Sequence, residues 1–370
     1  MSAAAPVFSA IDHAHMARAL QLAERARYTA YPNPVVGCVI AHGDTVVGEG
    51  FHLRAGGPHA EVHALRMAGE QARGATAYVT LEPCAHYGRT PPCALALIEA
   101  GVARVVCALG DPFDQVAGGG FALLREAGIT VDVGLMEAVA KEANIGFLSR
   151  VQRGRPFVRI KLAASLDGRT AMADGSSQWI TGPAARADVQ HWRARAGAVL
   201  TGAGTVLADD PRMDVRLDAS VDVATGLRVV LDATLRSLAR ANVRSGETPT
   251  LYLHAPDVVV PDGDWGNAAF APIALGADGR LDLQAVMAEL GLRGINEVHV
   301  EAGAQLCGAL VAAGLCDELL LYQAMTLMGD TARPLLAGLG IEAMDQQKRL
   351  QLVDAVMVGP DLRLRLRPVD

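Results

Sequence analysis

The sequence predicts an α/β protein of two domains, and three observations carry that prediction. The chain has 370 residues, more than one domain of ordinary size. Hydrophobic residues make up 51% and aromatic residues only 4%, which suits layers where small side chains separate helices from a sheet. Segments with helical periodicity alternate with short apolar runs along the whole chain. We therefore expect one domain over residues 1–150 and a second over 151–370.

The N-terminal half begins with a helix and then alternates strands and helices. Met16, Leu20 and Ala23 recur about one turn apart, which predicts a helix over 11–27. A hairpin is expected over 35–52, with its turn at residues 42–44. Helices over 59–72, 90–100 and 121–128 then alternate with strands over 75–83, 102–112 and 129–135. This order, β-β-α-β-α-β-α-β, predicts a three-layer α/β domain.

The C-terminal half starts again after VQRGRPFVRIK, whose Arg, Gly and Pro residues are typical of a crossing between domains. Strands are predicted over 157–165, 198–204, 227–233, 248–254, 295–303 and 318–324, and helices over 183–196, 281–291 and 303–313. The end forms a hairpin over 355–369 that turns at Gly359, Pro360 and Asp361. This order predicts a mostly parallel sheet with an antiparallel edge.

Charge and hydropathy exclude several function classes. The net charge of −7 and the pI of about 5.8 show no overall basic footprint for a nucleic acid. No run of 18 or more apolar residues predicts a membrane span, and the N-terminus does not have the pattern of a signal peptide. We therefore expect a cytoplasmic protein that contacts neither nucleic acid nor membrane and keeps its six cysteines reduced.

Two short motifs together indicate a metal site. LEPCAHYGRTPPC contains Cys84 and Cys93, and PHAEVHAL contains His59 and Glu61. This H-x-E … P-C … C order is that of the zinc nucleobase deaminases, in which one His and two Cys hold the metal. Bound zinc lowers the pKa of water to about 7, and the glutamate moves protons without binding the metal. The motifs predict one zinc ion held by His59, Cys84 and Cys93, with Glu61 as the proton shuttle.

The same residues are compatible with three other interpretations. The two cysteines could be plain buried thiols. They could instead hold a structural zinc with His86 as a fourth protein ligand. His59 and His63 are four residues apart, as in the zincins, but Glu61 follows the first histidine by two residues and not by one. The joint occurrence of both motifs in this order favours catalytic zinc.

With these motifs in place, the chain resembles the bifunctional riboflavin-biosynthesis deaminase/reductase family. YPNPVVGCVI, GFHLRAGGPHAEVHALRMAG and ATAYVTLEPCAHYGRTPPC are similar to its deaminase half. KLAASLDGRTA, SQWITG, TGAGTVLADDPRMDVR and HVEAGAQLCGALVAAGLCDEL are similar to its reductase half. The resemblance implies a cytidine-deaminase-like domain followed by a dihydrofolate-reductase-like domain, in a chain that forms homo-oligomers.

The resemblance also implies two consecutive reactions on small pyrimidine ribosyl phosphates. The first hydrolyses the 2-amino group of 2,5-diamino-6-(5-phosphoribosylamino)pyrimidin-4(3H)-one. The second uses NADPH to reduce the ribosyl chain of 5-amino-6-(5-phosphoribosylamino)uracil to ribityl. Asn33 would hold the first substrate, and His52, His86 and Arg89 would contact its phosphate. Arg89 could alternatively be a solvated loop residue.

In the reductase half, the resemblance implies a cofactor site and a substrate site. TGAGTV lacks the third glycine and the acidic residue of a Rossmann fingerprint, whereas the helix start in VEAGAQLCGAL suits a phosphate. The NADPH site would contain Ala163, Trp179, Thr205, Asp209, Gly303, Ala304, Gln305, Leu306, Cys307, Gly308 and Ala309. The substrate would contact Ser177, Arg193, Met213, Arg216 and Glu301.

Lys161 and Glu301 stand at the ends of two predicted strands and could act as catalytic groups. Either they handle protons as the ribosyl ring opens, or they only position the substrate. Two rival functions share part of this pattern: a nucleic-acid deaminase, and a zinc-bound deaminase whose reductase half only binds ligands. The acidic charge and the reductase motifs argue against the first rival.

Overall fold

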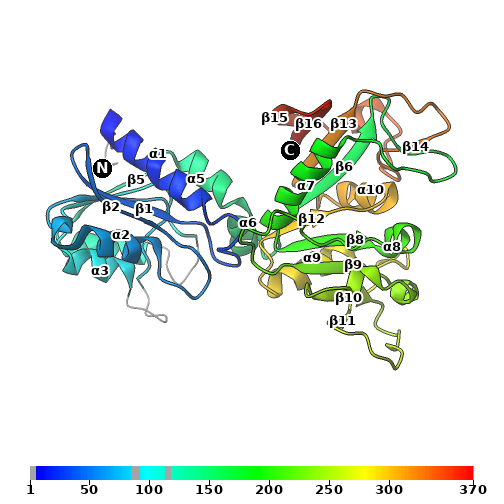
Figure 1. Ribbon diagram of the computed structural model, residues 1–370, viewed down its shortest axis with the longest axis horizontal. Helices are drawn as coiled ribbons and strands as arrows, with labels where there is room; N and C mark the ends of the chain where they lie inside the picture. The colour runs from blue at the N-terminus through cyan, green and yellow to red at the C-terminus, as the bar shows by residue number, and fades with distance from the viewer. Residues whose placement is uncertain (1–5, 86–91, 113–117, 370) are drawn as a thin grey trace. The chain divides into compact units, whose positions relative to one another are not determined.

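The computed structural model describes residues 6–85, 92–112 and 118–369, and it divides into two compact units. Unit 1 is Met1–Gly154 and unit 2 is Arg155–Asp370 (Figure 1). The division falls a few residues beyond the predicted boundary at 150/151. No helix in the described part of the chain combines the length and the apolar character that a membrane crossing needs.

Unit 1 is a five-stranded sheet covered by helices on both faces. Its elements are α1 (Ala10–Glu24), β1 (Gly37–His42), β2 (Thr45–Phe51), α2 (Ala60–Ala68), β3 (Thr76–Val79), α3 (Cys93–Glu99), β4 (Arg104–Cys107), α4 (Gly119–Glu126), β5 (Thr130–Val133), α5 (Glu137–Ala143) and α6 (Ile145–Arg153). The sheet order is β2-β1-β3-β4-β5, with β3, β4 and β5 parallel and β1 antiparallel to both of its neighbours. The predicted three-layer α/β domain is confirmed.

Two apolar cores lie on opposite faces of this sheet. Helices α2, α3 and α4 cover one face, where Ala64, Leu97 and Leu124 are buried. Helices α1, α5 and α6 cover the other face, where Met16 and Leu148 are buried (Figure 1). The layers pack closely because the sheet presents small residues: a Cβ at Gly37 would lie 1.9 Å from the Ala19 carbonyl oxygen of α1.

Unit 2 contains a nine-stranded sheet in the order β11-β10-β9-β8-β12-β6-β13-β16-β15. Its strands are β6 (Phe157–Ser165), β8 (Ala198–Gly202), β9 (Leu227–Leu231), β10 (Thr250–His254), β11 (Ala268–Pro272), β12 (Glu297–Val300), β13 (Glu318–Ala324), β15 (Leu350–Val358) and β16 (Asp361–Pro368). Its helices are α7 (Pro183–Arg195), α8 (Ala203–Asp209), α9 (Leu283–Leu292) and α10 (Ala304–Ala312), and β7 (Arg169–Ala171) pairs separately with β14 (Arg333–Pro334).

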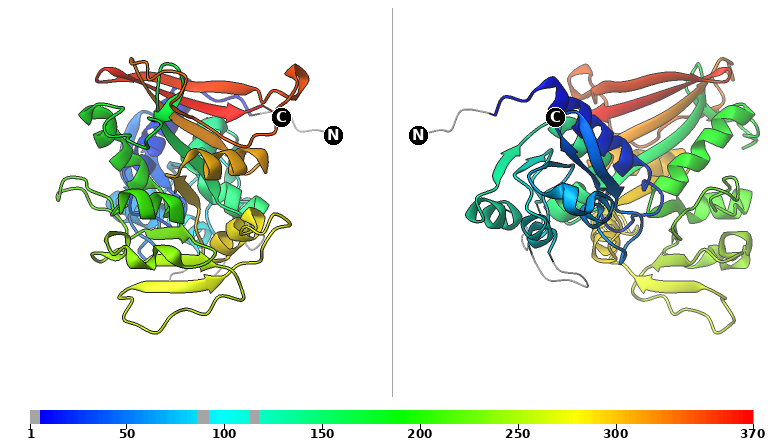
Figure 2. Two further views of the ribbon diagram at one scale, coloured as in Figure 1. Left: turned by 90° about the vertical axis from the view of Figure 1, so that its right-hand side faces the viewer. Right: turned by 60° about the vertical axis from the view of Figure 1, so that its left-hand side comes forward.

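The first seven strands in this order are parallel, and β16 and β15 add antiparallel pairs at one edge. Figure 2 shows the sheet running from β11 to the hairpin of β15 and β16. The predicted parallel sheet with an antiparallel edge is therefore confirmed. The structure adds helices α5, α6 and α8 and strands β7, β11 and β14, which the sequence patterns did not predict.

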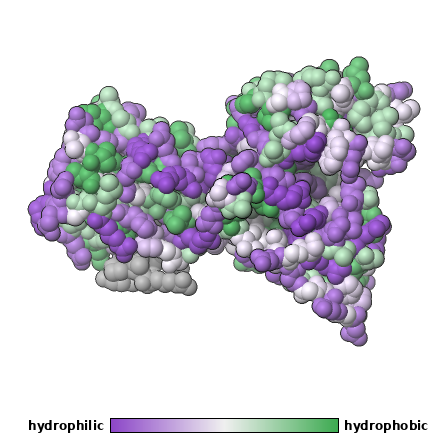
Figure 3. All heavy atoms as spheres, viewed as in Figure 1, coloured by the Kyte–Doolittle hydropathy of each residue, from purple (hydrophilic) through white to green (hydrophobic). Residues whose placement is uncertain are grey.

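Hydrophilic side chains are spread widely over the face of each unit seen in Figure 3, with hydrophobic groups scattered among them. This surface agrees with a chain in which 20% of the residues are charged.

Candidate functional site

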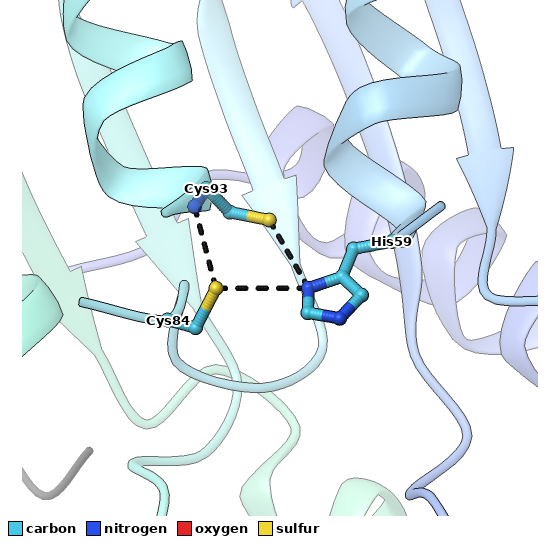
Figure 4. A group of neighbouring side chains, drawn as sticks. All are labelled: His59, Cys84 and Cys93. Carbon is cyan, nitrogen blue, oxygen red and sulfur yellow. Dashed lines mark hydrogen bonds between the residues drawn. The ribbon is translucent and has the colours of Figure 1, made fainter. Parts of the chain in front are cut away.

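The predicted metal ligands meet at one point of unit 1, at the starts of two helices. His59 is the residue before α2, Cys93 is the first residue of α3, and Cys84 lies in the segment after β3 (Figure 4). The His59 Nδ1 atom is 3.6 Å from Cys84 Sγ and 3.3 Å from Cys93 Sγ. Among the described residues, these three form the one group whose ligand atoms could share a metal, and all lie within 4.8 Å of one another.

The donor set and its spacing fit zinc. With Zn–N bonds of about 2.05 Å and Zn–S bonds of about 2.3 Å, tetrahedral geometry requires N···S separations of about 3.5 Å. The two observed N···S separations, 3.3 and 3.6 Å, lie on either side of this value. The Cys93 backbone N–H also donates to Cys84 Sγ at 3.3 Å, and neighbouring groups, first Cys93 and then His59, lower the pKa of the Cys84 thiol. This favours the thiolate that a metal needs.

Glu61 lies in the first turn of α2 and is buried, with 3% of its surface exposed. Burial raises the pKa of its carboxyl to about 7, while the charge of His59 opposes that rise. A carboxyl that titrates near neutrality can both accept and release a proton, which suits general acid–base chemistry.

Asn33 and His52 lie next to this cluster. The ring of His52 stacks edge-on against the ring of His59, with 5.4 Å between centroids. His52 is buried; its Nδ1 lies 3.1 Å from the Pro58 carbonyl oxygen and its Nε2 lies 3.0 Å from Asn33 Nδ2. Both ring nitrogens therefore have protein partners, so the predicted phosphate contact of His52 stays a prediction. His86 and Arg89 lie outside the described residues.

In unit 2, most predicted site residues gather at the carboxyl ends of neighbouring parallel strands. Lys161 lies in the middle of β6, not at the predicted strand end, and Ala163 lies in its last part. Glu301 follows β12, α8 begins directly after β8, and α10 begins three residues after Glu301. These segments carry Thr205, Asp209 and residues 303–309. The carboxyl edge of a parallel sheet is where α/β proteins bind ligands. Ser177 and the exposed Trp179 lie in the connection between β7 and α7.

Arg193 and Glu301 are joined by two hydrogen bonds, from Nε to Oε1 at 2.5 Å and from Nη2 to Oε2 at 2.8 Å. Burial opposes ionisation of Glu301, but the Arg193 guanidinium outweighs it and holds the pKa of the carboxyl well below its usual range. Arg193 Nη1 also donates to the Asp214 carbonyl oxygen at 2.9 Å. Through this bond Arg193 holds the loop that carries buried Met213 and exposed Arg216.

Lys161 and His299 add to this charged group. Burial lowers the pKa of the Lys161 ammonium, and the Glu301 carboxylate partly opposes that effect. His299 Nε2 lies 3.3 Å from Glu301 Oε1, and burial lowers the pKa of its ring. His299 was not among the predicted site residues; its position two residues before Glu301, where β12 continues into extended chain, was the available signal.

The start of α10 suits a phosphate. Its N-cap residue, Gly303, is exposed and has no side-chain cap, and a Cβ there would meet no atom within 4 Å. Free N–H groups in open space at a helix start favour an anion such as a cofactor phosphate.

Comparisons with known proteins decide the family. Residues 156–364 match the RibD C-terminal domain, and residues 9–109 match the cytidine and deoxycytidylate deaminase zinc-binding region. The chain belongs to the RibD family. It is 48% identical to the riboflavin biosynthesis protein RibD of Escherichia coli K12, over 96% of this chain and 99% of the relative. It is 42% identical to the Bacillus amyloliquefaciens RibD, over 97% of each chain.

Solved RibD structures have the same architecture. Acinetobacter baumannii RibD, form 1, superposes with a TM-score of 0.88 at 46% identity, over 97% of this chain and 99% of that one. A Thermotoga maritima diaminohydroxyphosphoribosylaminopyrimidine deaminase/5-amino-6-(5-phosphoribosylamino)uracil reductase superposes with a TM-score of 0.86 at 30% identity and the same coverage. This RibD-family chain is a bifunctional deaminase and reductase of riboflavin biosynthesis, with a zinc-binding deaminase domain. The comparisons give no support to an inert reductase half.

Proposed function

We propose that the protein performs two consecutive steps on pyrimidine ribosyl phosphates. In the first, 2,5-diamino-6-(5-phosphoribosylamino)pyrimidin-4(3H)-one and water give 5-amino-6-(5-phosphoribosylamino)uracil and ammonia. In the second, a hydride and a proton convert the ribosyl chain of that uracil to ribityl. Residues 1–150 would carry the first step and residues 151–370 the second. The observation that carries the proposal is the triad of His59, Cys84 and Cys93, spaced for zinc, beside the buried carboxyl of Glu61.

In the deaminase step, His59, Cys84 and Cys93 would hold one zinc ion, which would supply Lewis-acid activation of water. Glu61 would take one proton from the water and deliver it to the ring nitrogen, and would then take the remaining hydroxyl proton and deliver it to the amine, which leaves as ammonia. Burial raises the pKa of its carboxyl, which favours its use as both proton acceptor and proton donor. Asn33 binds the pyrimidine, and its bond to His52 at 3.0 Å fixes the orientation of its amide.

In the reductase step, NADPH is the proposed hydride donor. Its phosphate would lie at the start of α10, where Gly303 supplies no side-chain cap and the space beside its Cα is open. Ala163, Trp179, Thr205, Asp209 and residues 304–309 would form the rest of the cofactor site. Arg193 and Glu301 orient the ribosyl chain, together with Ser177, Met213 and Arg216. We also propose homo-oligomers and a cytoplasmic location, the latter supported by six free cysteines, two of which the zinc site needs as thiolates.

One assay tests both steps. Purified protein is given the diaminopyrimidine phosphate with NADPH, with NADH or with neither, and ammonia and cofactor oxidation are followed. We expect ammonia in all three mixtures and oxidation with NADPH. Zinc-loaded protein that releases no ammonia would overturn the deaminase assignment, and ammonia without oxidation of either cofactor would overturn the reductase assignment. Oxidation of NADH at an equal rate would overturn the NADPH preference alone.

A further inference from the structure

Glu82 lies two residues before the metal ligand Cys84 and is buried, with 5% of its surface exposed. Its carboxylate accepts four backbone N–H groups. Oε1 accepts from Gly120 at 3.0 Å and Phe121 at 3.3 Å, and Oε2 accepts from Asp111 at 3.2 Å and Gly118 at 3.1 Å. All four donors belong to the segment that follows β4 and begins α4. One carboxylate therefore joins the segment that carries Cys84 to two points of another segment.

These bonds supply the N-terminal cap of α4. The N-cap residue of α4 is Gly118, which has no side chain to accept a hydrogen bond. Gly120 and Phe121 are the second and third residues from the cap, so their N–H groups are among those left without helical partners. An anion at this end also complements the helix dipole. A helix is normally capped by the side chain of its own N-cap residue. In α4 the cap comes instead from Glu82, which lies outside the helix.

The same two segments are in direct contact beside the metal ligand. A Cβ on Gly120 would lie 1.9 Å from the Pro83 carbonyl oxygen, and a Cβ on Gly119 would lie 3.3 Å from the Ala85 side chain. The Glu82 backbone N–H donates to the Leu109 carbonyl oxygen at 2.9 Å, which extends the pairing of β3 and β4. The start of α4 is thus packed against residues 83–85, and Cys84 is in the middle of that stretch.

We propose that Glu82 is a positioning residue for the zinc site: by capping α4 it fixes the backbone that places Cys84 beside His59 and Cys93. The inference rests on the proposed zinc site. Glu82 itself does not touch the ligand atoms, and its effect passes through the backbone of residues 82–84. Residues that orient metal ligands without binding the metal typically change metal affinity by about 10- to 100-fold when they are replaced.

Glu82→Gln is the decisive variant because it keeps the size of the side chain. Each carboxylate oxygen of Glu82 accepts two N–H groups, so an amide nitrogen at either position would face two donors and could accept from neither. Asp282→Asn is the matched control. Asp282 caps α9 in unit 2 by accepting from Gln284 and Ala285, far in sequence from the metal ligands.

Zinc affinity is measured on the full chain by competition with a chromophoric chelator, and amide hydrogen exchange is followed in α4. We expect E82Q to bind zinc at least about tenfold more weakly, to need excess zinc for deamination, and to keep its reductase rate. D282N should bind zinc as the parent does. Faster exchange in α4 with unchanged zinc affinity would overturn the inference, because Glu82 would then only cap the helix.

A second variant tests the coupling without changing a charge. Gly120→Ala places a methyl group against the Pro83 carbonyl oxygen and should also weaken zinc binding; it decides the question if E82Q does not fold. Unchanged zinc affinity in G120A would likewise overturn the inference. Failure of the parent protein to bind zinc at all would instead contradict the proposed function, so the two failures are distinguishable.

Discussion

Replacing Arg193 by Gln should destabilise unit 2 through the carboxylate that it leaves behind. Arg193 and Glu301 retain only 10% and 17% side-chain exposure, and two hydrogen bonds join them. Without the guanidinium, Glu301 must either stay charged in a poorly hydrated place or take up a proton. The substitution also removes the bond to the Asp214 carbonyl oxygen and frees the loop that carries Met213.

The expected cost follows from the burial of the pair. Removing one partner of a buried ion pair costs about 3–5 kcal/mol, and the remaining exposure places R193Q near the lower end, at about 3 kcal/mol. Glu301→Gln likewise leaves the buried Arg193 guanidinium without its partner, so a similar cost of about 3 kcal/mol is expected. In R193Q/E301Q neither charge remains, and the double variant should be more stable than the sum of the single effects by about 2 kcal/mol.

Tryptophan fluorescence during urea unfolding can follow unit 2 alone. The three tryptophans of the chain, Trp179, Trp192 and Trp265, all lie in that unit. Arg293→Gln is the control because it breaks an exposed pair with Glu289 in the same unit, for which less than about 1 kcal/mol is expected. If the effects of R193Q and E301Q add to within about 0.5 kcal/mol in the double variant, the two groups are not coupled and the reasoning is wrong.

Three further predictions concern unit 1. Glu61→Gln should lower the deamination rate at least about 100-fold while zinc content and the reductase rate stay unchanged. A deamination rate near that of the parent would show that Glu61 does not transfer the protons. Stripping zinc with a chelator should abolish ammonia release and leave NADPH oxidation on the uracil substrate intact, and zinc should restore the loss. Burial opposes ionisation of Asp12, but hydrogen bonds from Ser9, Tyr78 and Arg104 together outweigh it and lower its pKa from 3.8 to about 2. Its stabilising effect is therefore complete above about pH 4 and lost as the pH falls toward 2, so Asp12→Asn should flatten the acid dependence of unfolding in unit 1, monitored by circular dichroism.

Helices and strands were predicted correctly where the local sequence alone favours them, and were missed where they depend on contacts with distant residues. Helix α7 begins at Pro183, as predicted, because a proline at the first helical position lacks only an N–H that would be unpaired anyway. Helix α6 was not predicted, because VQRGRP has the composition of a linker. Its start depends on distant contacts: the side chain of Asn144, its N-cap residue, pairs with the backbone N–H and C=O of Val35. Strand β11 likewise exists by pairing with β10.

The predicted and unpredicted site residues also differ in whether their signal is local in the sequence or depends on distant contacts. His59, Cys84 and Cys93 could be named because thiols and imidazoles in that order have few other uses. Glu82 could not be predicted in this way. Its partners are backbone N–H groups about 30 to 40 residues further along the chain, and the residue types that carry them do not reveal such bonds. Its position directly before Pro83 and Cys84 is the one local feature that could have raised the question.

The paired state of Glu301 also narrows the alternatives for the reductase proton. A carboxyl held ionised by Arg193 has no proton to donate near neutral pH, whereas an ammonium whose pKa is lowered by burial releases its proton more readily. We therefore propose Lys161 as the donor and Glu301 as the group that orients the ribosyl chain and keeps the ammonium charged. On this basis Glu301→Gln should raise KM for the uracil substrate more than it lowers kcat, and Lys161→Met should do the reverse. An E301Q enzyme with unchanged KM and a kcat reduced by 100-fold or more would show that Glu301, and not Lys161, donates the proton.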